Sequence, residues 1–135
     1  MRKLLYIPVY LLISLSIASC TPANEFPTGE FFMPLGMDYR ARDWWGVDGV
    51  TFNFYDDGTF TVTDTAGVQR ISGTYVIDGD KYTETSSDKQ SCIPAGPATY
   101  RWRFDDGYLT FIGLGEDECL DRMYLMGEKY LIKQE

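Results

Sequence analysis

The clearest folding signal in the chain is the segment 100–111, Tyr-Arg-Trp-Arg-Phe-Asp-Asp-Gly-Tyr-Leu-Thr-Phe. Aromatic or aliphatic residues alternate with polar ones on both sides of Asp106-Gly107, as expected for strands whose side chains point alternately to two faces. Asp-Gly suits a two-residue hairpin turn, because glycine adopts the positive φ that this turn needs. The segment predicts a β-hairpin. Further turn signals are Asp57-Gly58, Asp78-Gly79 and, more weakly, Ala66-Gly67 and Met126-Gly127.

The same alternation continues on both sides of this hairpin and predicts a β-meander. Eight strands are expected, at 49–55, 59–64, 68–77, 80–86, 97–104, 108–113, 120–126 and 129–134. Residues 36–44 are expected to form one short helix or a capping segment. The apolar run Glu30–Leu35 is expected to dock on the barrel, and the alternative is that it lies on the membrane surface. A meander with one apolar face protects its edges by closing on itself. The predicted fold is therefore an all-β, antiparallel up-and-down barrel in a single domain.

The N-terminus has the pattern of an export signal. Arg2 and Lys3 precede an apolar stretch, 4–17, that is shorter than the roughly 20 residues of a membrane-spanning helix. The next residues, Ile17-Ala18-Ser19-Cys20, resemble the lipobox of bacterial lipoproteins. This resemblance implies that Cys20 carries the lipid and that the chain is cleaved before it. An ordinary signal peptide with a coincidental cysteine is the alternative.

The lipobox sets the expected domain order and location. The signal peptide covers 1–19, the lipidated cysteine with a Pro-rich polar tether covers 20–29, and the barrel covers 30–135. The expected location is the bacterial cell envelope, with the membrane as a partner through the N-terminal lipid. Thr21 stands where an Asp usually signals inner-membrane retention in Gram-negative lipoproteins, and this points to the outer membrane there. Orientation toward the periplasm or the cell surface stays open.

The cysteines are interpreted in the light of export. With Cys20 lipidated, Cys92 and Cys119 remain as a pair in an oxidising compartment, where disulfides persist. We predict that they form a disulfide between the long loop after the fourth expected strand and the loop before the seventh. Two free thiols, or a site in which the two cysteines bind a metal, are the alternatives. The metal site is disfavoured because structural zinc normally has four Cys or His ligands.

Several segments resemble the small bacterial lipocalin-like domains of the calycin group. They are Phe52–Phe60 with its Asp-Gly turn, Gly73-Thr74-Tyr75-Val76, and the pattern Cys92…Tyr100-x-Trp102…Leu109…Cys119-x-x-Arg122. The resemblance covers about 49–134. It implies a barrel that binds a small apolar or aromatic ligand, and an arginine that covers an early tryptophan. Arg122 would then stack on Trp44 or Trp45, and the alternative is a surface arginine on an edge strand.

The candidate ligand-binding residues share one face of the predicted sheet. Aromatic side chains bury large areas, and tyrosine adds a polar tip suited to a mostly apolar pocket. The same rings can instead fill a small barrel and leave no room for a ligand. The predicted lining residues are Phe52, Phe54, Tyr75, Tyr100, Trp102, Phe104 and Arg122, with Phe60 on the same face.

Composition limits the other function classes. The net charge of -8 argues against nucleic-acid binding, and the absence of His removes His-dependent catalysis and His-ligated metals. No catalytic residues, metal or cofactor are predicted, because the acids lie mainly in turns, and the cluster Glu116-Asp117-Glu118 fits a solvated loop. Two main hypotheses follow: a lipid-anchored binder of a small apolar or aromatic ligand, or a structural or protein-interaction lipoprotein with a filled barrel. A third, a hydrolase or isomerase working through carboxylates, would require two acids facing into one pocket.

Overall fold

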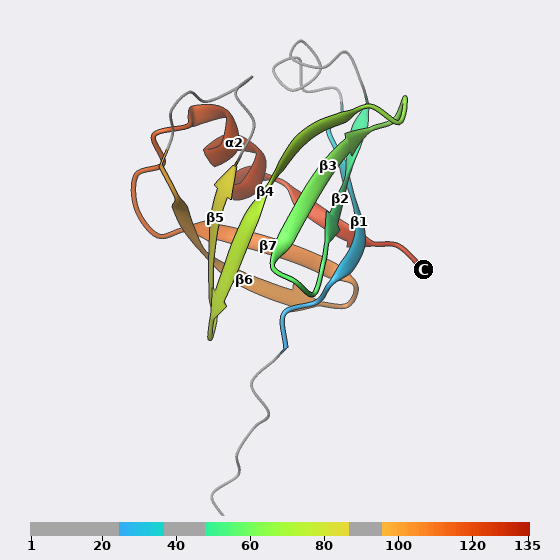
Figure 1. Ribbon diagram of the computed structural model, residues 1–135. Helices are drawn as coiled ribbons and strands as arrows, with labels where there is room; N and C mark the ends of the chain where they lie inside the picture. Colours follow the sequence, from blue (N-terminus) through green and yellow to red (C-terminus); the bar gives the residue numbers. More distant parts are fainter. Residues whose placement is uncertain (1–24, 37–47, 87–95) are drawn as a thin grey trace, which may run out of the picture.

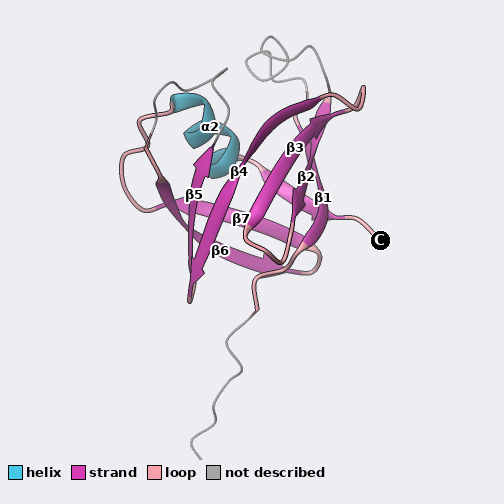
Figure 2. Ribbon diagram, viewed as in Figure 1, coloured by secondary structure: helices cyan, strands magenta, loops and turns pink. Residues whose placement is uncertain are grey.

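The computed structural model describes residues 25–36, 48–86 and 96–135, which form a closed antiparallel barrel of eight strands with one short helix (Figures 1 and 2). Each strand pairs with its neighbour in sequence, and the last strand pairs with the first. The predicted up-and-down barrel is therefore confirmed. Its strands are β1 (Gly29–Pro34), β2 (Gly49–Phe54), β3 (Thr59–Asp64), β4 (Gln69–Asp78), β5 (Lys81–Ser86), β6 (Ala98–Asp105), β7 (Tyr108–Gly113) and β8 (Tyr130–Lys133).

Up-and-down connectivity places alternate connections at the same end of the barrel. The segment 25–28 enters β1 at the end that also carries the β2–β3, β4–β5 and β6–β7 turns, which we call the Phe26 end (Figure 1). The helix α2 (Leu120–Glu128) joins β7 to β8 at the opposite end, which we call the α2 end. The three Asp-Gly turns therefore all lie at the Phe26 end.

The Asp-Gly turns have the backbone geometry that the sequence predicts. Gly58, Gly79 and Gly107 have φ of +81°, +60° and +80°. Asp106 also has a positive φ, +48°, so both central residues of the β6–β7 hairpin are left-handed. That is the requirement of the tight hairpin turn for which Asp-Gly is favoured.

The structure contains a strand, β1, that was not predicted from the sequence. We expected the run 30–35 to dock on the barrel, but Gly29–Pro34 forms β1 and pairs with β2 along its whole length. Phe31 and Met33 point inward and are fully buried. The alternation is hard to see in the sequence because Phe32 and Pro34, on the other face, are apolar too.

The predicted strand 120–126 is wrong, because these residues belong to helix α2. The buried side chains Arg122, Leu125 and Met126 recur at helical spacing, on the face toward the barrel. Cys119 is the N-cap, and its sulfur accepts a hydrogen bond from the Arg122 N–H at 3.2 Å. The turn predicted at Met126-Gly127 is likewise wrong, since both residues are helical.

Several predicted features lie outside the described residues. They are the signal peptide 1–19, the lipidation site Cys20, most of the helical candidate 36–44, Trp44, Trp45 and Cys92. Among the helices of the described residues, none has the length and apolar character needed to cross a membrane.

Candidate functional site

The predicted aromatic face lines the barrel interior and fills it. Six of the predicted side chains are buried and Phe104 is half-buried against them. The Phe54 ring centre lies 5.8 Å from Phe31, 5.8 Å from Phe52 and 5.6 Å from Tyr75. These are the separations of packed aromatic pairs. The buried aromatic residues of this core are Phe31, Phe52, Phe54, Phe60, Tyr75, Tyr82, Tyr100, Trp102 and Phe111, with Phe26 added from outside the strands.

The polar tips of these rings already have partners within the protein. The Tyr75 hydroxyl donates to the Tyr55 carbonyl at 2.6 Å, and the Trp102 indole N–H donates to the Gly79 carbonyl at 3.0 Å. Within the described parts of the chain, no buried side-chain nitrogen or oxygen lacks a hydrogen-bond partner. The core around these rings therefore offers no free donor or acceptor to orient a ligand.

One core ring does not come from the barrel wall. Phe26 precedes β1, in the segment predicted as tether, yet its side chain is buried. Its ring centre lies 5.3 Å from those of Phe54, Tyr75 and Trp102, and 5.6 Å from that of Tyr82. Phe26 therefore closes its end of the barrel in the manner of a plug.

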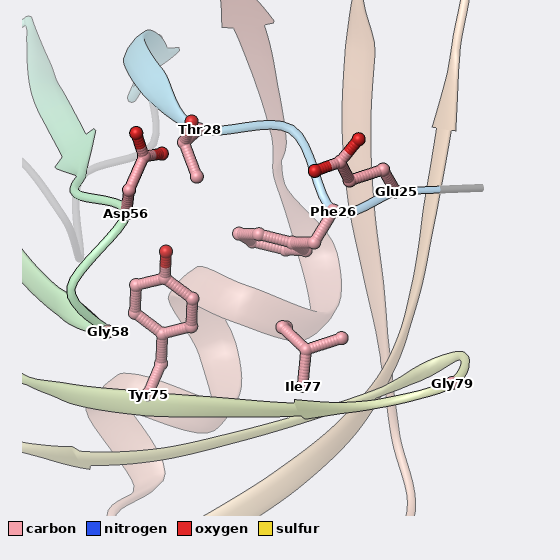
Figure 3. Close-up of a pocket in the computed structure, with 8 residues that line it drawn as sticks. All are labelled: Glu25, Phe26, Thr28, Asp56, Gly58, Tyr75, Ile77 and Gly79. Atoms are coloured by element: carbon pink, nitrogen blue, oxygen red, sulfur yellow. The ribbon is translucent and has the colours of Figure 1, made fainter. Parts of the chain in front are cut away.

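A pocket of about 690 Å³ lies beside this plug and opens to solvent. Phe26, Tyr75 and Ile77 supply its apolar wall, and the carboxylates of Glu25 and Asp56 stand on either side of the Phe26 ring (Figure 3). Thr28, Gly58 and Gly79 complete the lining. Of the ligand-binding residues predicted from the sequence, Tyr75 alone borders this pocket.

The α2 end holds a buried polar network instead. The Arg122 guanidinium donates to both carboxylate oxygens of Asp117, at 2.6 and 2.7 Å, and lies 3.7 Å from a Glu84 oxygen. Tyr100 donates to Asp117 at 2.5 Å, and Tyr82 donates to Glu84 at 2.8 Å. One guanidinium thus faces two buried carboxylates.

Burial and charge shift the two carboxyl groups in opposite directions. Burial raises the pKa of Glu84 to about 7, although the Tyr82 hydrogen bond and Arg122 act against the rise. Burial also works against ionisation of Asp117, but hydrogen bonds from Arg122 and Tyr100 hold its pKa below its usual value. Asp117 is therefore the ionised partner of Arg122, whereas Glu84 is mostly protonated below about pH 7 and mostly ionised above it.

This network corrects the predictions for two residues. Arg122 is not a surface residue on an edge strand, because it is buried on a helix and paired with Asp117. Its predicted stacking partners, Trp44 and Trp45, lie outside the described residues. Asp117 does not belong to a solvated acidic loop, since it is buried.

Of the two cysteines predicted to form a disulfide, Cys119 lies in the described part of the chain. Cys119 is buried and disulfide-bonded. Cys92 lies outside the described residues, so its pairing with Cys119 stays a prediction. Within the described ranges, no group of three or more His, Cys, Asp or Glu side chains is placed to hold a metal ion.

Sequence reasoning missed Phe26, Glu25 and Glu84. Glu84 could have been found, because it follows Tyr82 by two residues and therefore shares the inward face of its strand. Phe26 and Glu25 carry no such periodic signal, since they lie in no strand or helix.

The chain was compared with protein-family models, with curated proteins and with solved structures, and no match was found in any of the three. The site must therefore be interpreted from its own geometry.

Proposed function

We propose that this chain is a lipid-anchored envelope lipoprotein that binds a small apolar or aromatic ligand at the Phe26 end of its barrel. The observation that carries the ligand part is the Phe26 ring, which lies among four core rings but belongs to no strand. The barrel therefore contains a place for one aromatic group whose present occupant is a side chain of the N-terminal segment.

Phe26 can leave this place without breaking the barrel. Among the described residues, one hydrogen bond holds the segment 25–28: the Lys133 ammonium donates to the Thr28 carbonyl. Strand pairing begins only at Gly29, opposite Phe54. A ligand with an aromatic group would replace Phe26 against the same rings, and the open pocket beside it would hold the rest of the molecule.

The proposed anchor places this pocket near a membrane. Glu25 follows Cys20 by five positions along the chain, and an extended chain spans at most about 3.5 Å per residue, so the gap is no more than about 18 Å. A lipid on Cys20 would thus hold the Phe26 end close to the lipid surface. A molecule that leaves or approaches the membrane would meet this end first.

A second candidate function is favoured by the packing of the interior. The rings inside the barrel are in contact with one another and their polar tips are satisfied, as in a solid core. If the Phe26 ring never leaves the core, the chain is a structural or protein-interaction lipoprotein with no small ligand. The two candidates differ in what happens when Phe26 is replaced.

The anchor is tested by expressing the full chain in a bacterial host and weighing the protein from the membrane fraction. The expected mass lacks residues 1–19 and includes acyl chains, and the C20A variant should show neither change. Cleaved, unacylated protein in the soluble fraction would contradict the lipoprotein assignment.

The ligand site is tested with the same lipidated protein in non-ionic detergent. Native mass spectrometry looks for a co-purifying small molecule, and ligand-observed NMR titration measures binding of 2-phenylethanol, a neutral aromatic probe. Binding should be at least about tenfold tighter for F26A than for the unaltered chain or for F26W, which refills the same place. Equal titrations for F26A and F26W, with no co-purifying molecule, would favour the filled-barrel interaction protein.

A further inference from the structure

The rim of the pocket carries two carboxylates above an aromatic wall. Glu25 and Asp56 come from different parts of the chain, the N-terminal segment and the β2–β3 turn, and Figure 3 shows them on either side of the Phe26 ring. Gly58 and Gly79 also border the pocket and carry no side chain that could fill it. The wall therefore combines ring faces with negative charge.

Neither rim carboxylate is neutralised by the protein. Within the described residues, neither Glu25 nor Asp56 has an ion-pair partner, whereas Asp80 pairs with Arg101 and Asp105 pairs with Arg103. Arg101 and Arg103 are thus already paired with other acids. The Lys133 ammonium lies on the Phe31 ring, 4.6 Å from its centre, and against the Thr28 carbonyl rather than on a rim carboxylate.

The negative potential reaches the wall of the pocket. The pKa of Tyr75 is raised first by burial and then by the charges of Asp56 and Asp57. The same turn therefore acts electrostatically on a ring that lines the pocket. An anionic group placed beside Tyr75 would be repelled, and a cation would be attracted both by the carboxylates and by the ring faces.

We propose that the ligand of this pocket is a small organic cation, an ammonium group on an aromatic or alkyl body. Its charge lies near Glu25 and Asp56, and its body takes the place of the Phe26 ring beside Tyr75 and Ile77. This inference rests on the proposed function and adds the charge of the ligand to it. A bare metal ion fits less well, because no group of three or more potential metal ligands converges within the described residues. A pocket of about 690 Å³ also exceeds what an ion needs, and it falls within the roughly 300–1,000 Å³ of small-molecule sites.

The test compares three probes of nearly the same shape on the lipidated full chain in non-ionic detergent. They are 2-phenylethylammonium, the neutral 2-phenylethanol and the anionic phenylacetate, each titrated by ligand-observed NMR. The cation should bind at least about tenfold tighter than the alcohol, and phenylacetate should bind weakest. Raising the salt concentration from 50 to 500 mM should weaken binding of the cation and leave binding of the alcohol unchanged.

Charge-removing variants locate the effect. The double variant E25Q/D56N should weaken binding of 2-phenylethylammonium about tenfold or more and leave binding of 2-phenylethanol unchanged. D106N is the matched control, because Asp106 lies in another turn at the same end but does not line the pocket, and asparagine tolerates its positive φ. D106N should change cation binding less than twofold.

The outcomes separate this inference from the proposed function. If the cation and the alcohol bind equally, or if the double variant has no effect, the ligand is not a cation although the pocket still binds aromatic molecules. If D106N weakens cation binding as much as the double variant does, the overall negative charge of this end attracts the cation. The assignment of the site to Glu25 and Asp56 would then be wrong. If no probe binds even to F26A, the pocket and the proposed ligand function fail together.

Discussion

At the α2 end of the barrel a guanidinium is held by carboxylates, and at the Phe26 end a phenyl ring is held by other rings. Arg122 makes directional, charge-assisted hydrogen bonds to Asp117, and nothing of similar size can replace it without leaving a buried charge. Phe26 makes non-directional contacts that any apolar group of similar shape can make. The α2 end is therefore held by contacts that no other group of similar size can make, whereas the ring at the Phe26 end can be exchanged at a small cost in free energy.

The largest effect is expected from Arg122→Met, which keeps the length of the side chain and removes its charge. Asp117 and Glu84 would then be buried beside each other without a cation, and breaking one partner out of a buried pair costs about 3–5 kcal/mol. Urea unfolding should show a loss of that size, and Arg122→Lys should recover part of it. A loss below about 1 kcal/mol would mean that water reaches the α2 end and that its closure is not the Arg122 network.

The disulfide would add a covalent tie at the same end. Cys119 caps α2, and a bond to Cys92 would close a loop of about 28 residues, which stabilises the fold by roughly 3–4 kcal/mol in the chain-entropy view. C92S should therefore lower the free energy of unfolding by that amount, and dithiothreitol should reproduce the loss in the unaltered chain. Peptide mapping without reductant should join the two cysteines. A different partner for Cys119 would contradict the pairing but not its position at the α2 end.

Protonation of Glu84 makes the α2 end of the barrel pH-sensitive. Since the pKa of Glu84 is raised to about 7 in the folded chain, its stabilising contribution is complete at low pH and is lost as the pH rises from about 4.5 to about 7. The groups that face it are Tyr82 on its own strand, Tyr100, Arg122 and Asp117. Asp117, with its lowered pKa, acts in the opposite sense and at more acid pH. The chain has no His that would titrate in the same range.

The test is urea unfolding at several pH values for the unaltered chain and for E84Q, which imitates the protonated acid. The unaltered chain should lose about 2–3 kcal/mol between pH 4.5 and 7.5, and E84Q should stay nearly flat. E84D, which keeps the charge, should preserve the slope. If E84Q retained the same slope, another group would be responsible for it and Glu84 would be ionised throughout.

Replacing the ring at the other end should cost less. Phe26→Ala removes a buried ring, for which core substitutions cost about 3–5 kcal/mol. Because the segment 25–28 can move away from the barrel, only part of this loss is expected. The free energy of unfolding should fall by about 2 kcal/mol. Phe26→Leu should keep most of the stability, and hydrogen exchange should rise only at the Phe26 end. A loss as large as that of Arg122→Met would show that Phe26 is an ordinary core residue and would remove the basis for ligand exchange.

The two ends also differ in how far they could be predicted from the sequence. The Asp-Gly turns of the Phe26 end were predictable because positive φ is a local requirement that glycine meets by itself. The barrel followed from period-two alternation in β2 to β7. Glu84 was within reach for the same reason, since its place two residues after Tyr82 gives its direction, although not its partner.

The rest depended on contacts between distant residues. Helix α2 has only nine residues, and in so short a segment alternation and helical spacing overlap, so its packing on the barrel decides between them. β1 was hidden because its outer face is apolar at Phe32 and Pro34. Phe26 gave no signal, because a phenylalanine in a polar segment becomes a plug only where four rings from separate strands surround it.

The smallest expected effect compares one turn from each end. Gly107, at the Phe26 end, and Gly67, at the α2 end, both have φ of +80°, and an added Cβ would meet no atom within 4 Å at either. G107A and G67A therefore measure backbone strain alone, about 1 kcal/mol each. The β3–β4 turn has a further support, because Asp64 accepts the N–H groups of Ala66 and Val68. If urea unfolding gives equal losses of stability, the two ends differ in the Arg122 network and the Phe26 plug but not in their turns. A clearly smaller loss for G67A would show that the Asp64 hydrogen bonds make the turn at the α2 end more tolerant of the substitution.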